Sequence, residues 1–514
     1  MIRIKPTPLV IGLMWAGFAT SGWSSVPPQE EAVPAKDVIV AAAYYPWYKG
    51  TGEGWVQWVG SKKVRTAYTP LLGYYDNRWP KTLSKHITWA TAYGIDAFMI
   101  EWCGLAGGGF PASYDDVVQR FLDNPDFKKI KFFFVYSFSQ ALRKDGEPTA
   151  PVINLDDPER VNKLVSDYKY VARTYFTQPN QLKIDGRPVT YLWAIRNTKG
   201  NFKAAMAKLR RAVKSVCGSD PYIIGEEMYY GSPPGLVRTS ALDAVMPYMM
   251  LKGETPIRNY KIEETIDDVV SQYKGARLVC ADLGVKFVPA GFAGFNAAGA
   301  PWCYDKLGKL TTPVVARSVS GFKTFVQKAR GAIDPSLRMF LLTSWSEWNE
   351  GTNIEPAKEF GLRYLNVVKS ELASFTPVPL PKDTVKFAFK RVWNPPGSDN
   401  RLLAAAFDKV EILDAAGHVL LKVDIGTSAA RSSMGIGFFF DGTGWDGADN
   451  FCWAGDLLKY ATLHLNLPAG AAAIRFRVAQ IPDQYIDVFL NGKNLGRFPV
   501  QVPREWTSYT ATLN

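Results

Sequence analysis

Short apolar segments alternate with segments of helical periodicity from residue 38 to about residue 373, and this alternation limits the fold more than any other feature. Most of the apolar segments are continuous rather than alternating, as in parallel strands covered on both faces. Eight segments of this kind occur, at 38–45, 94–102, 131–138, 188–195, 221–227, 242–248, 285–292 and 338–345. Eight strand–helix units predict an α/β fold, a (β/α)8 TIM barrel with enlarged loops over residues 38–373.

Helical patterns occupy most of the intervals between these segments. The clearest predicted helices cover 79–94, which ends on Gly94, and 156–176, which begins on Asp156 with a proline close behind. Two further stretches, 199–218 and 315–332, have the same character. The interval 228–241 is short and fits a helix least well.

The texture of the sequence changes after residue 373. Residues 374–384 contain three prolines and no periodicity, which indicates a linker. Residues 385–514 have short strand patterns, with two β-like runs about a turn within 409–425. Asn491-Gly492 separates two further runs and is a strong hairpin signal. We therefore predict an all-β sandwich, jelly-roll-like, as an accessory domain.

The N-terminus has the order of a secretory signal. Arg3 and Lys5 precede an apolar run from Leu9 to Phe18, and small residues follow. We expect residues 1–25 to be a signal peptide, 26–37 a tether, and the protein to be exported to the periplasm or the extracellular space. The apolar run is short for a bilayer and no second long one follows, so no membrane span is predicted.

Composition limits the chemistry. The net charge is +12, yet the sequence has no run of five Lys or Arg and no nucleic-acid motif, so we expect a diffuse basic surface and no nucleic-acid partner. The five cysteines form no CxxC pair, which argues against a disulfide scaffold and a structural zinc site. With only three histidines, any acids and bases should be carboxylates. We expect no metal, no cofactor and a monomer.

Polar and aromatic residues gather where the predicted strands end, which is the face that carries chemistry in such barrels. Flat aromatic rings beside carboxylates are typical of a carbohydrate cleft. Each of these glutamates is equally compatible with a simple ion pair to Arg or Lys. The candidate substrate-binding residues of this rim are Tyr45, Trp47, Glu101, Trp102, Tyr136, Glu226 and Tyr248.

The end of the eighth strand is the richest part of the rim. Glu347 and Glu350 follow the apolar run 338–345, with Trp348 and Asn349 between them as further candidate substrate-binding residues. Cleaving a glycosidic bond commonly needs one protonated and one ionised carboxyl group, and two carboxylates in one dry cleft separate their pKa values. Gly351 permits the turn that would bring both to one ligand. The spacing alone is also common on helices.

Five motifs resemble glycoside hydrolase family 99 and occur in the same order as in that family. They lie at 44–48, 71–78, 94–102, 185–193 and 344–356, and the resemblance covers the barrel region only. It implies an endo-α-1,2-mannosidase or mannanase that retains anomeric configuration. In that family the residue matching Glu347 acts as a base on the sugar 2-hydroxyl, forming a 1,2-anhydro sugar, and the residue matching Glu350 is the general acid and then base. Many members have His at the position of Asn349. Asn cannot titrate, so this difference leaves the acid pair intact but leaves the identity of the substrate open.

These observations lead to an expectation of an exported, retaining endo-glycosidase that cleaves α-linked mannose-containing glycans or polysaccharides. Carbohydrate is the expected partner. One alternative is a hydrolase of another α-linked polysaccharide. The other is a non-catalytic glycan-binding envelope protein, against which the intact pair Glu347 and Glu350 argues.

Overall fold

The computed structural model describes most of the chain after residue 37. The predicted signal peptide and tether lie outside the described residues. Residues 37–514 form one compact unit by their contacts. The described ranges are 38–50, 55–57, 63–64, 66–105, 113–148, 150–252, 257–300, 303–305, 308–373, 375, 377–396, 401–439, 451–499 and 502–513.

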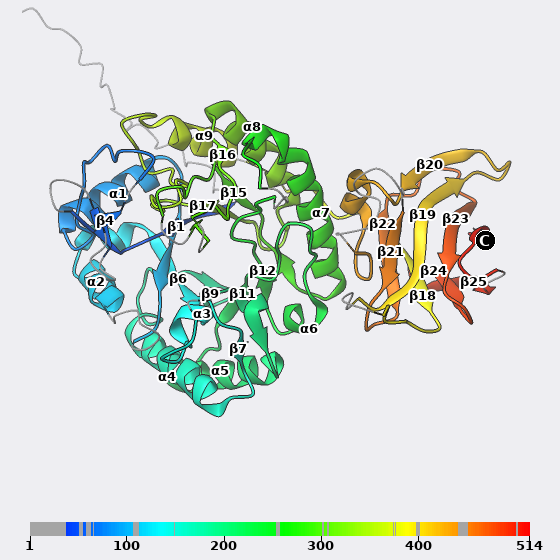
Figure 1. The fold of residues 1–514 in the computed structure, drawn as a ribbon, viewed down its shortest axis with the longest axis horizontal. Coiled ribbons are helices and arrows are strands. Elements are labelled where there is room, and N and C mark those ends of the chain that lie inside the picture. Colours follow the sequence, from blue (N-terminus) through cyan, green and yellow to red (C-terminus); the bar gives the residue numbers. More distant parts are fainter. Residues whose placement is uncertain are drawn as a thin grey trace, which may run out of the picture. The chain divides into compact units, whose positions relative to one another are not determined.

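A curled sheet of parallel strands forms the centre of the first part of the chain, with helices outside it (Figure 1). Its main path runs β14-β12-β11-β9-β6-β5-β1-β17-β15. The bounds are β1 (Ile39–Tyr44), β5 (Ala97–Trp102), β6 (Lys131–Ser137), β9 (Arg187–Trp193), β11 (Tyr222–Gly225), β12 (Ala244–Val245), β14 (Lys286–Phe287), β15 (Ala290–Phe292) and β17 (Met339–Thr343).

The barrel closes within the segment predicted as the seventh strand. This segment is divided: β14 pairs with β12, whereas β15 pairs with β17 at the other end of the sheet. Val288 N donates to Val245 O at 2.9 Å, and Leu341 N donates to Pro289 O at 3.0 Å. Because Pro289 has no N–H, the change of partner falls where the chain lacks a donor. The predicted (β/α)8 barrel is therefore confirmed, with its seventh strand interrupted.

The helices follow the strands in the predicted alternation. Side-chain caps start several of them: Asp157 accepts from Glu159 N at 3.0 Å before α4, and Ser318 accepts from Gly321 N at 2.8 Å before α8. The predicted helix 315–332 starts late, since β16 (Val315–Ala316) pairs with β13 (Tyr260–Lys261). The helices are α1 (Pro80–Ala92), α2 (Ser113–Leu122), α3 (Phe138–Ala141), α4 (Pro158–Thr174), α5 (Phe202–Cys217), α6 (Leu236–Thr239), α7 (Ile266–Asp282), α8 (Val319–Ala329) and α9 (Arg363–Leu372).

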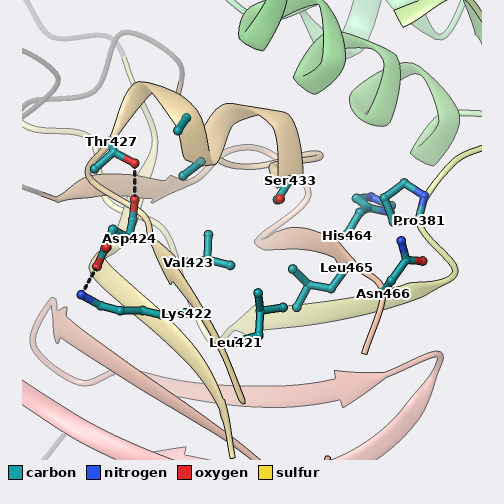
Figure 2. Close-up of a pocket in the computed structure, with 12 residues that line it drawn as sticks. Pro381, Leu421, Lys422, Val423, Asp424, Thr427, Ser433, His464, Leu465 and Asn466 are labelled. Carbon is teal, nitrogen blue, oxygen red and sulfur yellow. Dashed lines mark hydrogen bonds and ion pairs between the residues drawn. The ribbon is translucent and has the colours of Figure 1, made fainter. Parts of the chain in front are cut away.

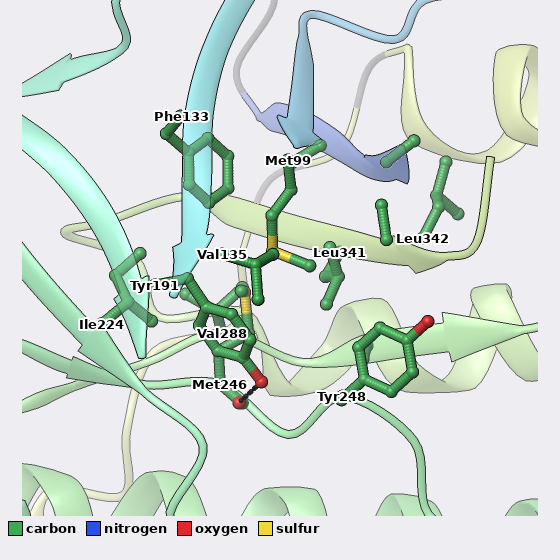
Figure 3. Packing of buried hydrophobic residues seen from close by; sticks show 14 of the residues in the cluster. Met99, Phe133, Val135, Tyr191, Ile224, Met246, Tyr248, Val288, Leu341 and Leu342 are labelled. Carbon is green, nitrogen blue, oxygen red and sulfur yellow. Dashed lines mark hydrogen bonds between the residues drawn. The ribbon is translucent and has the colours of Figure 1, made fainter. Parts of the chain in front are cut away.

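Apolar side chains fill the barrel interior. Figure 3 shows Met99, Val135 and Leu341 from three strands packed together, and Tyr191 donating to Met246 O, a bond of 3.1 Å. Each fully buried side chain of this size contributes about 1.5–3 kcal/mol. This core makes a rigid base for the residues that follow the strand ends. Short strands outside the barrel path are β2 (Tyr48–Gly50), β3 (Trp55–Gln57), β4 (Lys63–Val64), β7 (Ile153–Asn154), β8 (Lys183–Ile184) and β10 (Thr198–Lys199).

Two antiparallel sheets form the C-terminal region, as predicted. One has the order β22-β18-β24-β25, and the other β20-β19-β23-β26 with β21 also paired to β19. Phe387 of the first sheet packs against Phe407 and Phe476 of the second, with ring centroids 4.9 and 5.3 Å apart. The strands are β18 (Asp383–Phe389), β19 (Leu403–Leu413), β20 (Val419–Asp424), β21 (Cys452–Gly455), β22 (Tyr460–Leu465), β23 (Ala473–Gln480), β24 (Tyr485–Leu490), β25 (Lys493–Pro499) and β26 (Trp506–Thr512).

The hairpin turn predicted at Asn491-Gly492 is present in this region. Asn491 and Gly492 have φ of +49° and +85° and join β24 to β25, so the predicted hairpin is present. The predicted linker ends earlier than residue 384, because β18 begins at Asp383.

Contacts with helix α7 hold one edge of the C-terminal region. Asp282 accepts hydrogen bonds from Thr462 and from Ile436 N, and Arg431 pairs with Asp268. Arg431 belongs to the short 3-10 helix η6 (Ser428–Ser433). Among the described residues, no helix is both long and apolar enough to cross a membrane.

Candidate active site

The loop after β17 folds back on itself. Ser344 N donates to Thr352 O at 3.2 Å, and Ile354 N returns a bond to Ser344 O at 2.8 Å. Gly351 has a φ of +61°, a conformation that favours glycine, and this is the turn expected there. Asn296 N, from the chain after β15, donates to Glu350 O at 2.6 Å. The loop is thereby fixed at both its base and its tip.

Backbone and side-chain donors orient Glu347. Its own N–H donates to Ser344 Oγ at 2.7 Å, which fixes the backbone. Its Oε1 accepts from Asn349 N at 3.1 Å and from Tyr48 OH at 3.4 Å. Glu347 is only 3% exposed. Burial, and then the negative charge of Glu350, raise the pKa of Glu347 well above its usual range.

Glu350 is half-buried, and its charge acts on the buried Glu347; we call the surroundings of these two carboxyl groups the recess. Burial raises the pKa of Glu350 to about 7. Within the described part of the chain, no side chain forms an ion pair with either carboxyl group, and none donates a hydrogen bond to that of Glu350. The negative charge of Glu350 opposes the ionisation of Glu347, so the two carboxyl groups lose their protons one after the other. The pair therefore combines an acid and a base in one recess.

Two tyrosines and a third carboxyl group complete the recess. The hydroxyl groups of Tyr45 and Tyr248 are hydrogen-bonded to each other, although the residues are 203 positions apart. Burial raises the pKa of both, and the charges of Glu347, Glu350 and Glu101 raise them further, so the three carboxyl groups lie near the tyrosine pair. Burial raises the pKa of Glu101 to about 8.

Glu355, in the same loop, has a different environment. It is fully buried and accepts from Tyr75 OH at 2.7 Å and Trp348 Nε1 at 3.0 Å, while His86 Nε2 lies 3.0 Å from its other oxygen. His86 Nδ1 in turn lies 3.0 Å from Tyr44 OH. This closed network anchors the loop to helix α1 and leaves Glu355 without a free oxygen for a ligand.

Three of the predicted rim residues lie behind the recess. Trp102 Nε1 donates to Asp115 at 2.9 Å, and Tyr136 OH donates to Asp167 at 2.8 Å, so both side chains face the helix layer. Trp348 is fully buried against Glu355, with its ring 5.4 Å from that of Trp55. None of the three is proposed further as a substrate contact, since helices or the loop itself occupy their polar atoms.

The remaining predicted residues lie on or near the recess. Trp47 is half-buried, with its ring 4.5 Å from that of Tyr45. Asn349 is 2% exposed, and neither atom of its amide has a partner among the described residues. Glu226 accepts from Ala194 N at 2.9 Å and Tyr229 OH at 3.0 Å, and burial raises its pKa to about 7. Their roles stay predictions.

Sequence reasoning missed two residues that position the pair. Tyr48 OH accepts from Trp348 N at 2.9 Å and donates to Glu347 at 3.4 Å, so one hydroxyl links β2 to the acidic loop. Ser346 Oγ accepts from Tyr45 N at 3.0 Å. Tyr48 belongs to the aromatic run 44–48, which was the available signal, whereas nothing in the sequence pointed to Ser346.

A hollow of about 500 Å³ lies in the C-terminal region between β20, η6 and β22 (Figure 2). Its described lining offers one carboxylate, Asp424, which pairs with Lys422 at 2.6 Å. It therefore lacks the paired acid and base that the barrel recess has. All five cysteines are free thiols. The described residues contain no group of three or more His, Cys, Asp or Glu placed to hold a metal ion.

The fold and the recess define a class of protein: a (β/α)8 barrel with a glycosidase-like fold and a buried carboxylate pair after the eighth strand. A family model described as "Glycosyltransferase WbsX" matches residues 47–368. The match covers more than half of the chain, and the protein belongs to this family. Comparison with curated proteins gives no match.

Solved structures agree with the barrel. A "Glycoside hydrolase-like protein" is 21% identical with a TM-score of 0.52, covering 66% of this chain and 95% of its own. A family 99 endo-α-mannosidase from Bacteroides thetaiotaomicron is 18% identical with a TM-score of 0.47, over 65% of this chain and 95% of its own. A family 113 β-1,4-mannanase is 9% identical with a TM-score of 0.42, over 66% and 100%. The first of these structures supports the barrel fold, and a family 99 enzyme is among the structures to which the barrel region is similar.

Proposed function

We propose that the protein is a retaining glycosidase that cuts within α-linked, mannose-containing glycans, with Glu347 and Glu350 as its acid–base pair. The observation that carries the proposal is the environment of these two carboxyl groups. They are buried together at the carboxyl end of a barrel strand, and no described cation neutralises them. Such a pair costs stability and is useful where protons must move.

The hydrogen bonds support different roles for the two groups. Asn349 N–H and Tyr48 OH donate to Glu347, which favours its ionised form and suits a base. The charge of Glu350 opposes that form, so protonation of Glu350 makes ionisation of Glu347 easier. The proposed productive state is an ionised Glu347 beside a protonated Glu350. Because the pKa of Glu347 is raised well above its usual range and that of Glu350 to about 7, this state requires that the proton pass from Glu347 to Glu350 before the reaction starts.

The proposed reaction has two steps at one carbon. Glu347 takes the proton of the sugar 2-hydroxyl, the 2-oxygen attacks the anomeric carbon, and Glu350 gives its proton to the departing oxygen. A 1,2-anhydro sugar and a shortened glycan result. Glu350 then takes a proton from water as the water oxygen attacks the same carbon, and Glu347 returns its proton to the 2-oxygen. Two inversions restore the starting configuration.

The family description favours a second candidate, transfer to a sugar hydroxyl in place of water. The same pair serves both outcomes, since the acceptor only replaces water in the second step. A nucleoside diphosphate sugar is a poor donor for this recess, because the ionised form of Glu347 or Glu350 would repel its phosphates and no described cation neutralises the pair. The proposed donor is a neutral glycan in both cases.

The test is product analysis. Purified protein is incubated with α-mannan, α-linked manno-oligosaccharides and α-glucans, and products are sized by chromatography and mass spectrometry. Shorter internal fragments support hydrolysis, and products longer than the substrate support transfer. No product from any α-mannoside, with a folded protein, would overturn the proposal. We further propose that the chain is exported, on the signal pattern of residues 1–25.

A further inference from the structure

A row of residues crosses the outer face of the five-stranded sheet in the C-terminal region. Trp453 of β21 pairs with Ala406 of β19, Ala406 pairs with Ala479 of β23, and Ala479 pairs with Trp506 of β26. Directly paired residues in an antiparallel sheet have side chains on the same face. Two tryptophans therefore flank two alanines on one surface.

The neighbours of this row show that it faces away from the core of the sandwich. Cys452, Val478 and Tyr509 belong to the buried cluster between the sheets. Side chains alternate along a strand, so Trp453, Ala479 and Trp506 point the other way. Trp506 is 38% exposed. Polar contacts with α7 come from Arg431, Ile436, Thr462 and His464, which lie outside this row.

Phe451 joins the two tryptophans. Its ring centroid lies 6.2 Å from that of Trp453 and 5.8 Å from that of Trp506. Ala406 is only 3% exposed although it lies on the outer face. The two alanines have small side chains, and the three rings lie close to one another on the same face. We call Phe451, Trp453, Trp506, Ala406 and Ala479 the tryptophan face.

Polar groups continue this surface along the strands. Arg477 lies 5.3 Å from the centre of the Trp506 ring and pairs with Asp408, while Arg475 pairs with Glu411 at 2.7 Å. The arginines keep further N–H donors but have their charge balanced locally. Beyond Trp506, β26 exposes a series of hydroxyl groups, those of Ser508, Thr510 and Thr512.

We propose that the tryptophan face is a binding site for a neutral polysaccharide chain, separate from the barrel recess. Apolar faces of sugar rings pack on exposed aromatic rings, and the adjacent guanidinium and hydroxyl groups satisfy the sugar hydroxyls. Nucleic acid or an anionic membrane would need unpaired cations, whereas both arginines here have carboxylate partners. This site would hold the protein on a polysaccharide. The proposal does not require that Glu347 and Glu350 be catalytic.

The experiment measures retention of the full chain in native gels that contain a soluble polymer. The gels run toward the cathode because the net charge is +12. The probes are α-mannan, β-mannan, xylan and dextran. All variants carry Glu350→Gln, so that the polymer is not degraded and binding is read without turnover.

Retention by at least one polymer is expected for the parent. Trp506→Ala and Trp453→Ala should each weaken it roughly 5- to 30-fold, as truncating a central aromatic contact does. Trp393→Ala is the matched control, since Trp393 is 37% exposed in the same region and lies outside the face. It should bind like the parent, and Trp506→Phe should retain most of the affinity.

Three results would overturn the proposal. The first is no retention of the parent by any probe, with a folded protein by circular dichroism. The second is equal retention of Trp453→Ala, Trp506→Ala and the parent. The third is a concentration-dependent dimer that Trp506→Ala abolishes, which would identify a second copy as the occupant. A failure of the barrel chemistry would leave polymer retention unchanged, so the two proposals fail separately.

Discussion

The loop after β17 contains two kinds of buried carboxylate within nine residues, Glu347 and Glu350 on the recess side and Glu355 on the side packed against α1. Every oxygen of Glu355 has a partner, and the residue ties His86, Tyr75 and Trp348 together. Glu347 has two donors, both to Oε1, and Glu350 has none among the described residues. Burial alone therefore does not distinguish a structural carboxylate from a chemical one; the completeness of its hydrogen bonding does.

The largest effect should come from removing the titratable groups. Glu347→Gln and Glu350→Gln each keep the side-chain volume, so folding should survive while proton transfer fails. We expect turnover to fall ~10²–10⁴-fold in each, the usual value of general acid–base help. Initial rates on a glycan cleaved by the wild type provide the measurement.

The control for this pair is Glu159→Gln, a glutamate that is 78% exposed at the start of α4. It should leave the rate unchanged. A near wild-type rate in either recess variant would place the chemistry elsewhere and remove the contrast with Glu355.

Removing Glu355 should lower stability more than activity, the opposite of the effect expected for Glu347 and Glu350. Glu355→Ala leaves three buried donors or acceptors without their partner, at ~1–3 kcal/mol for each unsatisfied group. We expect the free energy of unfolding to fall by about 3–5 kcal/mol in a denaturant titration. Activity should fall only as far as the loop loses order. A stability unchanged from the wild type would show that the network does not anchor the loop.

The pH dependence of stability should separate the two kinds of carboxylate. Because folding raises the pKa of Glu350 from 4.5 to about 7, the folded state holds this proton more tightly than the unfolded state. Its contribution to stability is fully present below about pH 4.5 and is lost as the pH rises through about 7. Glu350→Gln should therefore gain up to about 3 kcal/mol relative to the wild type between these values. Unfolding curves that shift in parallel at every pH would contradict this.

The smallest effect concerns the hydroxyl that links strand and loop. Tyr48→Phe removes the bonds to Trp348 N and to Glu347 but keeps the ring, which stacks on Trp55 at 4.5 Å. Each lost bond costs about 0.5–1.5 kcal/mol, so we expect roughly a tenfold lower rate and a modest loss of stability. Tyr68→Phe, on a half-buried tyrosine beside Arg317, serves as a control and should leave the rate unchanged.

The barrel and the location of the acidic pair could be predicted from the sequence because both depend on local sequence patterns. Continuous apolar runs marked the strands, and Glu347 and Glu350 follow the eighth of them directly. The division of the seventh strand depends on Pro289 meeting two different neighbours, which only the closed barrel reveals. The partners of Glu355 are up to 280 residues away, at Tyr75, so the loop's own sequence did not disclose them.

Trp102 and Tyr136, predicted to bind substrate, have side chains that point away from the barrel interior. The register pairs Trp102 with Tyr136 and Glu101 with Val135. Neighbouring positions on a strand face opposite sides, so Glu101 and Val135 point into the barrel while Trp102 and Tyr136 point to the helices. The alternation of side chains along each strand predicts these orientations once the residues that face the barrel interior have been assigned for that strand.

The most direct test of the account is the configuration of the first product. With a glycan that the protein cleaves, ¹H NMR in the first minutes resolves the anomer released before mutarotation. The proposed mechanism predicts the same anomer as in the substrate, because the sugar 2-oxygen and then water attack one carbon, assisted by Glu347 and Glu350. An inverted first product would contradict the base role of Glu347 and leave Glu350 as an acid beside a water activated by another carboxylate of the rim.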